Sequence, residues 1–594
     1  MAFHLENNAP ATLVLRLAIG IVQGLAFYLL ARITATGPSD TMSVWLYTTL
    51  VITSVAVPPV LLAGLTTMRL ITLIAWATTV AAAAYAISVH ASWQQPEADR
   101  FAFTWLVFPL SAAVFIGHNL LAAADADERP IARYYAYFDI SWRNGIQFAL
   151  SLAFVGAFWL LLYLGASLFE LIKITLVRDV IGKSSFASIS SCIVFALAVQ
   201  ITSERISLVT GARTIALLLL GWLLPVMTMF AVAFLASLAF TGLEPLWATG
   251  RATQILVVAG ATLIVLINAT YQDGSEEHRP AGVLRLSARI AALTIAPITL
   301  IAFYSVWLRV VQYGLTPERI MGLALIALGA CYAIGYVVAA VWPGRWLRPI
   351  ETTNVVAAIA AVAVVLSLLT PVADPVRLSV ADQVERLKAG TTDLAKFDFD
   401  FLKFDAGRYG REALESLAAD KSTPAAQAIA VKAEDARQRK QRLTAIGNPP
   451  VQLSPDEMRN KIRVLPAGAT LPDTFLTQDW GNATSSPRIC IRDAAPGFTC
   501  EAMLADIDRD NVPDILLRSN SFDIAVFHLT PAGTWELLGR FGTVECDAGM
   551  AGNFDSGTIR TAPSQFNDLE IKGHHVHLDA PCPTPPQPAT PDAR

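Results

Sequence analysis

Runs of about 20 mostly apolar residues recur through the first 371 positions of the chain, each long enough to cross a hydrocarbon layer about 30 Å thick. They predict eleven membrane-spanning helices, at residues 12–33, 43–66, 70–89, 102–123, 145–168, 186–203, 214–240, 252–270, 289–309, 319–342 and 352–371. The run at 186–203 is short and rich in Ser, so a re-entrant or interfacial segment is the alternative there. The first run lacks a basic leader and a small-residue cleavage site, and we expect a retained helix rather than a signal peptide.

Beyond residue 371 the pattern is typical of a water-soluble protein. Residues 372–450 alternate as amphipathic helices do, with a capped entry at Ser379 and a second helix starting at Thr423-Pro424. From residue 451 short β-like runs are broken by Gly, Pro and Asp, most clearly at 515–517, 523–529 and 534–538. The last residues, 581–594, are Pro-rich and predict a disordered tail.

We therefore predict an α-helical polytopic membrane bundle of about eleven transmembrane helices, followed by a C-terminal extracytoplasmic α+β domain that is mostly β after residue 450. The division is a transmembrane domain at 1–371, a helical juxtamembrane segment at 372–450, a β-rich domain at 451–580 and the tail.

Composition and charge support this division. Hydrophobic residues make up 54% of the 594 and charged residues only 15%, against about 25% charged in a soluble domain. Residues 1–371 carry a net charge of +3 and residues 372–594 carry −7, which together give the −4 of the whole chain. Neither part has the clustered Lys and Arg of a nucleic-acid-binding protein.

Two patterns indicate the orientation. With a cytoplasmic N-terminus, the predicted inner loops hold eleven Lys and Arg residues and the outer loops seven, as the positive-inside rule requires. An odd number of spans then places the C-terminal part outside. Four cysteines lie in that part, which suits an oxidising compartment. We favour the pairs Cys490–Cys500 and Cys546–Cys582, which close local loops. A zinc site is the alternative, but no two of the four have C-x-x-C spacing.

An acidic loop in the C-terminal part is the most specific chemical motif. Asp506, Asp508, Asp510 and Asp514 occupy positions 1, 3, 5 and 9, and Val512 offers a backbone carbonyl at position 7, so their oxygens can converge on Ca²⁺. The loop resembles FG-GAP and dockerin-type calcium loops, but it lacks the Gly at position 6 and the bidentate Glu at position 12 of an EF-hand. We predict a stabilising Ca²⁺ site, with a metal-free acidic turn as the alternative.

Polar side chains also gather in the predicted outer loops. These are Glu170, Glu244, Trp247, Arg251, Arg309, Gln312, Tyr313 and Arg319. Charges, an amide and aromatic rings in one layer can bind an anionic or sugar-bearing ligand, or form ion pairs that lock the helices together.

Four stretches carry a resemblance to a known family. They are Thr241-Gly-Leu-Glu-Pro-Leu-Trp-Ala-Thr-Gly-Arg-Ala-Thr253, Asn268-Ala-Thr-Tyr-Gln-Asp-Gly274, Val311-Gln-Tyr-Gly-Leu-Thr-Pro-Glu-Arg319 and Phe404-Asp-Ala-Gly-Arg-Tyr-Gly-Arg-Glu-Ala-Leu414. The chain resembles the bacterial inner-membrane family called domain of unknown function 4153, over most of residues 1–420. The resemblance implies a multi-pass protein of the bacterial inner membrane and no established activity.

Three classes of function remain open. The chain contains no phosphate-binding loop, no H-E-x-x-H, no G-x-S-x-G and no dinucleotide-binding motif. We favour an envelope protein whose exported domain binds or senses a small-molecule ligand or another envelope protein. The first alternative is a secondary transporter of a small solute. The second is a membrane-embedded transferase that acts on a lipid-linked substrate with Glu244 or Glu170 as its base, and an enzyme is the less favoured class.

Overall fold

The computed structural model describes residues 9–35, 42–95, 105–248, 251–275, 280–439, 453–465, 468–478, 480, 488–491, 500–507, 511–518, 524–530, 533–541, 569–571 and 574–576. The chain forms two compact units, which divide between Arg439 and Lys440. The first unit holds the apolar helices together with the helices that follow them, and the second holds the small β-sheet.

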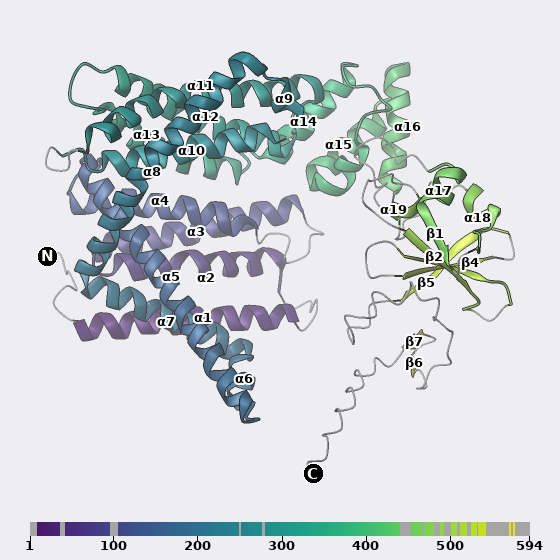
Figure 1. Cartoon of the computed structure of the whole chain (residues 1–594), viewed down its shortest axis with the longest axis horizontal. Coiled ribbons are helices and arrows are strands. Elements are labelled where there is room, and N and C mark those ends of the chain that lie inside the picture. Colours follow the sequence, from purple (N-terminus) through teal and green to yellow (C-terminus); the bar gives the residue numbers. More distant parts are fainter. Residues whose placement is uncertain are drawn as a thin grey trace, which may run out of the picture. The chain divides into compact units, whose positions relative to one another are not determined.

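Eleven described helices are long and apolar enough to cross a membrane, as the hydrophobic pattern predicts. They are α1 (Ala9–Ala35), α2 (Val44–Gly64), α3 (Leu70–Gln94), α4 (Val107–Ala126), α5 (Tyr134–Leu171), α7 (Ser184–Glu204), α8 (Ile206–Thr241), α10 (Ala252–Tyr271), α11 (Gly282–Tyr313), α12 (Pro317–Val341) and α13 (Pro349–Leu368). Two short helices, α6 (Leu176–Ile181) and α9 (Glu244–Ala248), lie in the connections. The Ser-rich run forms the full helix α7, which packs along α1 and α5 (Figure 1).

Three spans begin earlier than their apolar runs. Helices α5, α8 and α11 start at Tyr134, Ile206 and Gly282, several residues before the predicted 145, 214 and 289. Each added turn carries Arg, Asp or Ser among apolar residues, which lowers the hydropathy but leaves the helical conformation favourable. Hydropathy marks the part of a helix that lies in lipid, and it misses the polar extension.

The spans form two sub-bundles with separate cores. The first sub-bundle, α1 to α5 with α7, packs around residues such as Ile52, Val80 and Leu110. The second sub-bundle, α8 and α10 to α13, packs around residues such as Leu263 and Ile295. Helix α13 also contacts α4 and α5, so a seam between the sub-bundles runs along these helices.

The outer surface of the spans is strongly apolar. Only 6% of the most hydropathic window of α5 is buried within the protein, and Phe108 and Phe240 are 83% and 91% exposed. A soluble protein rarely exposes such a large contiguous apolar surface. A lipid bilayer is the medium that suits this surface, since lipid tails cover it without ordering water.

The spans alternate in direction, which defines two faces. We call the face where α1 begins the N-side and the face where α13 ends the C-side. Contacts between helix ends fix the N-side, because Arg16 near the start of α1 reaches Thr66 beyond the end of α2, and Arg69 before α3 reaches Asp125 at the end of α4. Arg16 is 1% exposed, and its guanidinium donates to Gln200 of α7 at 2.7 Å.

Helices α14 (Pro375–Lys388), α15 (Gly407–Ala419) and α16 (Pro424–Gln438) follow the last span and belong to the first unit. They share a small core in which a π-helical turn, η3 (Phe401–Asp405), leads into α15. Thr423 caps α16 as predicted. The predicted entry at Ser379 is wrong: Asp374 caps α14, and Ser379 lies inside the helix, where its hydroxyl donates to the Leu315 carbonyl.

The second unit contains a five-stranded sheet in the order β1-β2-β3-β4-β5. The strands are β1 (Ile462–Leu465), β2 (Cys500–Ala505), β3 (Asp514–Arg518), β4 (Ile524–Leu529) and β5 (Trp535–Phe541), and β1 is parallel to β2 while the others are antiparallel. The short helices α17 (Pro455–Lys461), α18 (Asp473–Thr477) and α19 (Arg488–Ile491) and a hairpin of β6 (Leu569–Ile571) and β7 (His574–Val576) complete the described elements. Three strands match the β-like runs of the sequence, and Phe475, Trp480, Phe527 and Trp535 form the core.

Candidate functional site

A cavity of about 280 Å³ lies in the seam between the two sub-bundles. Helices α4 and α5 line it from one side, and α10, α12 and α13 from the other. The helix termini that approach it, such as the start of α5 at Tyr134 and the end of α10 near Asn268, place it toward the N-side. No sequence motif pointed to it.

Carboxamides and phenols from helices on both sides of this cavity form a continuous network. Asn354 of α13 donates to Asn268 of α10 at 2.5 Å and to the Tyr134 hydroxyl of α5 at 3.1 Å. The Tyr336 hydroxyl of α12 donates to Asn354 at 2.8 Å and accepts from Asn268 at 2.9 Å. One network therefore joins four spans across the seam, at roughly 0.6 kcal/mol for each hydrogen bond inside a membrane protein.

Asn119, which lines the cavity from α4, has a carboxamide partner of its own. The Asn144 side chain of α5 donates to Asn119 of α4 at 2.8 Å, and Asn119 donates to the Phe115 carbonyl. Asn119 lies inside the predicted span at 102–123, where a polar side chain marks an interior surface or a cavity. Asn144 precedes the predicted span at 145–168, so the sequence could not show that the two asparagines meet.

Ion pairs join helix ends on the N-side, and one of them, between α5 and α8, crosses from one sub-bundle to the other. Asp125 accepts from Arg69 at 2.7 Å, Asp127 from Arg133 at 2.5 Å, and Asp139 pairs with Arg213. The hydrogen bonds from Arg133 hold the pKa of the Asp127 carboxyl below its ordinary value. A second hollow at this face is lined by Asp127, Asp139 and Arg143, and both of its carboxylates are engaged by these arginines.

On the C-side, helix α14 holds the loop between α11 and α12. Asp382 accepts from the Leu315 backbone at 2.7 Å, Gln383 donates to the Tyr313 and Leu315 carbonyls at 3.0 Å, and Arg386 donates to the Val311 carbonyl. Gly314 has φ +75°, and an added Cβ would lie 2.7–2.8 Å from Gln383 and Asp382. This loop is therefore shaped to receive α14.

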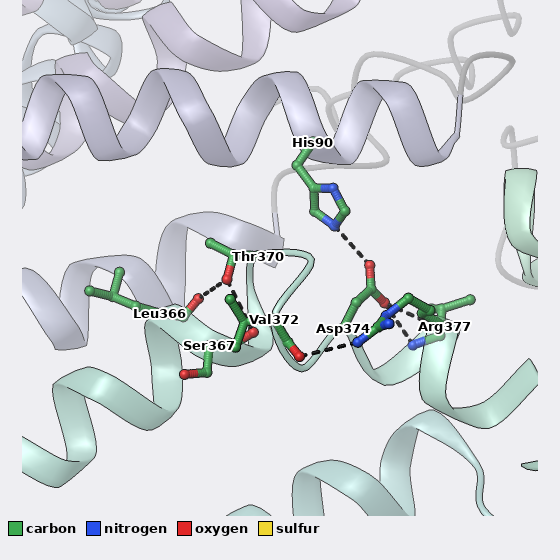
Figure 2. A network of polar contacts seen from close by, with 8 residues as sticks. His90, Leu366, Ser367, Thr370, Val372, Asp374 and Arg377 are labelled. Atoms are coloured by element: carbon green, nitrogen blue, oxygen red, sulfur yellow. Dashed lines mark hydrogen bonds and ion pairs between the residues drawn. The ribbon is translucent and has the colours of Figure 1, made fainter. Parts of the chain in front are cut away.

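Helix α14 is also joined to α3 of the first sub-bundle. His90 near the end of α3 reaches Asp374 across 2.8 Å, and Figure 2 shows the ring pointing down onto the carboxylate at the start of α14. The other carboxylate oxygen accepts from the backbone N–H groups of Val376 and Arg377. Because side-chain exposures are only 11% for His90 and 4% for Asp374, the contact is shielded from solvent.

The start of α15 packs against the same end of α3. The Arg408 guanidinium lies 4.7 Å from the Trp93 ring centre, and the Tyr409 ring meets Trp93 edge-on at 5.5 Å. Gly407 has φ +53°, and a Cβ there would lie 2.4 Å from the Gln94 carbonyl oxygen. Helices α14 and α15 thus contact α3 and the α11–α12 loop together, which bridges both sub-bundles at the C-side.

The structure distributes the predicted outer-loop residues among separate contacts. Arg319 donates to the Gly314 carbonyl at 2.5 Å and lies over the Tyr313 ring, so these two neighbours do meet. Glu170 pairs instead with Arg178 at 2.7 Å, and its role as the base of a transferase stays a prediction.

The remaining members are placed at helix ends. Glu244 begins α9 and Arg251 precedes α10, while Arg309 and Gln312 lie in the last turn of α11, where Gln312 is exposed. Trp247 belongs to α9, but its side chain is outside the described structure. A shared ligand site at this face stays a prediction.

The acidic loop of the second unit is described in part. Asp506 accepts from the Asn511 backbone at 3.2 Å, and Asn511 has φ +65°, the left-handed conformation that the turn requires. Asp514 is 2% exposed and accepts from the Ile507 backbone, while the Val512 position follows the turn. Asp508 and Asp510 lie outside the described residues. Within the described ranges no group of three His, Cys, Asp or Glu side chains is placed to hold a metal, and the Ca²⁺ site stays a prediction.

One predicted disulfide is present. Cys490 and Cys500 are bonded and fully buried beside the core of the second unit. Cys546 and Cys582 lie outside the described residues, so their pairing stays a prediction.

These features define a polytopic α-helical membrane protein with an appended β-sheet unit. Comparison with family models matches residues 25–418 to the Domain of unknown function (DUF4153), and the chain belongs to this family. Neither the curated proteins nor the solved structures gave a match.

Proposed function

We propose that this chain is a protein of the bacterial plasma membrane with a cytoplasmic N-terminus, and that its exported second unit binds or senses a small-molecule ligand or another envelope protein. The bias of Lys and Arg toward the N-side loops supports the orientation. The Cys490–Cys500 disulfide supports an oxidising compartment for the second unit.

The single observation that carries a sensing role is the bridge made by α14 and α15. Asp374 contacts α3 of the first sub-bundle, and Asp382 contacts the loop between α11 and α12 of the second. In the sequence, α16 is the last helix of the first unit before the second unit begins at Lys440. A displacement of the small helical body formed by α14, α15 and α16 would act on both sub-bundles at once.

A truncation tests this proposal. A chain that ends after Arg439 keeps the whole first unit, and we expect it to insert in the membrane normally. We expect it to fail to complement a deletion strain grown under envelope stress, whereas the full chain restores growth. Complementation by the truncated chain would contradict a sensing role for the second unit.

The seam cavity favours a second candidate, a transporter of a small solute. Secondary transporters place their substrate between two helical bodies, and the cavity lies between two sub-bundles with separate cores. Solute uptake by proteoliposomes that persists in the chain truncated after Arg439 would favour this candidate over the sensor.

A further inference from the structure

The seam cavity has no charged side chain in its lining. Glu351, whose carboxylate accepts from the Tyr271 hydroxyl at 2.7 Å, does not line the cavity. Moving an ionised group from water into a site without a counter-ion costs several kcal/mol or more. The cavity therefore disfavours phosphates, carboxylates and ammonium groups.

Several polar groups of the lining are left for a ligand. The side chains of Ser141, Trp142 and Tyr332 line the cavity and have no hydrogen-bond partner among the described residues. The Tyr134 hydroxyl accepts from Asn354, which leaves its own proton available. Polar groups in a partly buried wall require a partner from a ligand or from water. A ligand hydroxyl suits this set because it both donates and accepts.

Aromatic rings make up much of the remaining wall. Phe115 and Phe138 face the cavity together with Tyr137 and Trp142. Such rings offer flat apolar surfaces, against which the C–H faces of a sugar ring or a glycerol backbone pack while the hydroxyls reach the polar edge.

The polar wall is held rigidly. In the network, both amide hydrogens of Asn354 are used and its oxygen accepts from Tyr336. A site whose side chains are already fixed loses little conformational entropy when a ligand binds. Asn354 lies about 8 Å along α13 from the N-side end, at 1.5 Å per residue, a depth that a dissolved solute or a lipid headgroup can reach.

We propose that the seam cavity binds an uncharged polyol group, such as a glycosyl or glycerol moiety. The group can belong to a free solute or to the headgroup of a neutral membrane lipid. Binding at this site does not depend on the orientation of the chain or on any role of the second unit.

The test uses the full chain in lipid nanodiscs and follows its unfolding temperature, which rises when a ligand binds the folded state. The free probes are methyl β-D-glucopyranoside, methyl β-D-galactopyranoside and glycerol, with methyl β-D-glucuronide as the charged counterpart. The lipid probe is monoglucosyl diacylglycerol, with glucuronosyl diacylglycerol as its counterpart. We expect at least one neutral probe to stabilise the chain with an affinity at least tenfold above its charged counterpart.

The arms separate the two sources. Stabilisation by a free probe assigns the site to a solute, and stabilisation by the lipid probe alone assigns it to a headgroup. Failure of every neutral probe, or equal affinity for the glucuronides, would overturn the proposal.

Variants place the binding in the cavity. Tyr332→Phe removes one lining hydroxyl and keeps the ring, so we expect affinity to fall about fivefold, the effect of one hydrogen bond. Ala358→Phe fills the space, and we expect binding to be lost. Tyr163→Phe is the matched control, because Tyr163 lies on α5 outside the lining and is 60% exposed. Equal loss of affinity in Tyr163→Phe and Tyr332→Phe would also refute the proposal.

Discussion

The contact between His90 and Asp374 makes a quantitative prediction for helix α14. Asp374 serves two purposes, since one carboxylate oxygen caps the helix and the other meets the His90 ring at 2.8 Å. Loss of an N-cap costs about 1 kcal/mol, and loss of a hydrogen bond costs about 1 kcal/mol more. Asp374→Ala removes both, and we expect the local opening of α14 to become easier by about 2 kcal/mol.

Hydrogen exchange of the full chain in nanodiscs measures this change. About 2 kcal/mol corresponds to roughly 30-fold faster exchange for the peptide that spans 375–388, since each 1.4 kcal/mol is tenfold. His90→Phe removes the ring contact and leaves the N-cap in place, so it isolates the contribution of the contact and should speed exchange about fivefold. Asp374→Asn keeps an N-cap of similar strength and an amide group that can still hydrogen-bond the His90 ring, so it should speed exchange less than His90→Phe does.

Thr423→Ala supplies the control, because Thr423 caps α16 in the same small core without touching α3. We expect it to speed exchange in α16 and leave α14 unchanged. Native exchange over 375–388 in Asp374→Ala would refute the reasoning. So would an equal effect of Asp374→Asn and Asp374→Ala, because capping would then contribute nothing.

Three further predictions concern other parts of the chain. Gly407→Ala should detach α15 from α3 and alter Trp93 fluorescence, because its Cβ would lie 2.4 Å from the Gln94 carbonyl; Gly390→Ala, with φ +71° and open space around it, should cost only about 1 kcal/mol of backbone strain. The Cys490–Cys500 disulfide restrains the unfolded chain by closing a short loop. Its reduction removes that restraint and should lower the stability of the second unit by about 2–3 kcal/mol; a calorimetric transition unmoved by reductant would contradict this. The lowered pKa of Asp127 predicts a contribution to stability that is present above about pH 4 and lost as the pH falls through the folded-state pKa, and Asp127→Asn should flatten that part of the stability profile against pH.

The spans and the sheet could be predicted because their signals are local. A run such as 252–270 is apolar over its whole length, and α10 occupies Ala252–Tyr271. The strand pattern at 523–529 likewise becomes β4. Helix starts were harder: α5 begins at Tyr134 rather than 145 because polar residues near a helix end lower hydropathy without stopping the helix.

The seam network could not be predicted, because its members are distant in sequence. Asn354 meets Asn268 and Tyr134, which lie 86 and 220 residues away, and Tyr134 precedes the predicted span at 145–168. The C-side loop shows the same limit. Its motif at 311–319 was recognised, but the partners Asp382 and Gln383 lie in a helix outside the membrane part. The charged residues of this loop suggested a ligand site. In the structure, the backbone of the loop also holds α14.

Residues in three of the motifs that carry the family resemblance make contacts between helices. Asn268 belongs to the seam network. Gly314 leaves room for the side chains of α14, and Gly407 allows α15 to approach α3. Three of these stretches thus serve contacts between helices.

Labelling of single cysteines from outside the cell tests the central claim that the two faces lie in different compartments and that the second unit is exported. Lys421 lies in the exposed turn between α15 and α16 on the C-side, and Arg129 lies in the exposed N-side connection between α4 and α5. In intact spheroplasts, a membrane-impermeant maleimide should label Lys421→Cys at once and should label Arg129→Cys only after permeabilisation. Labelling of Arg129→Cys with protection of Lys421→Cys would contradict the account.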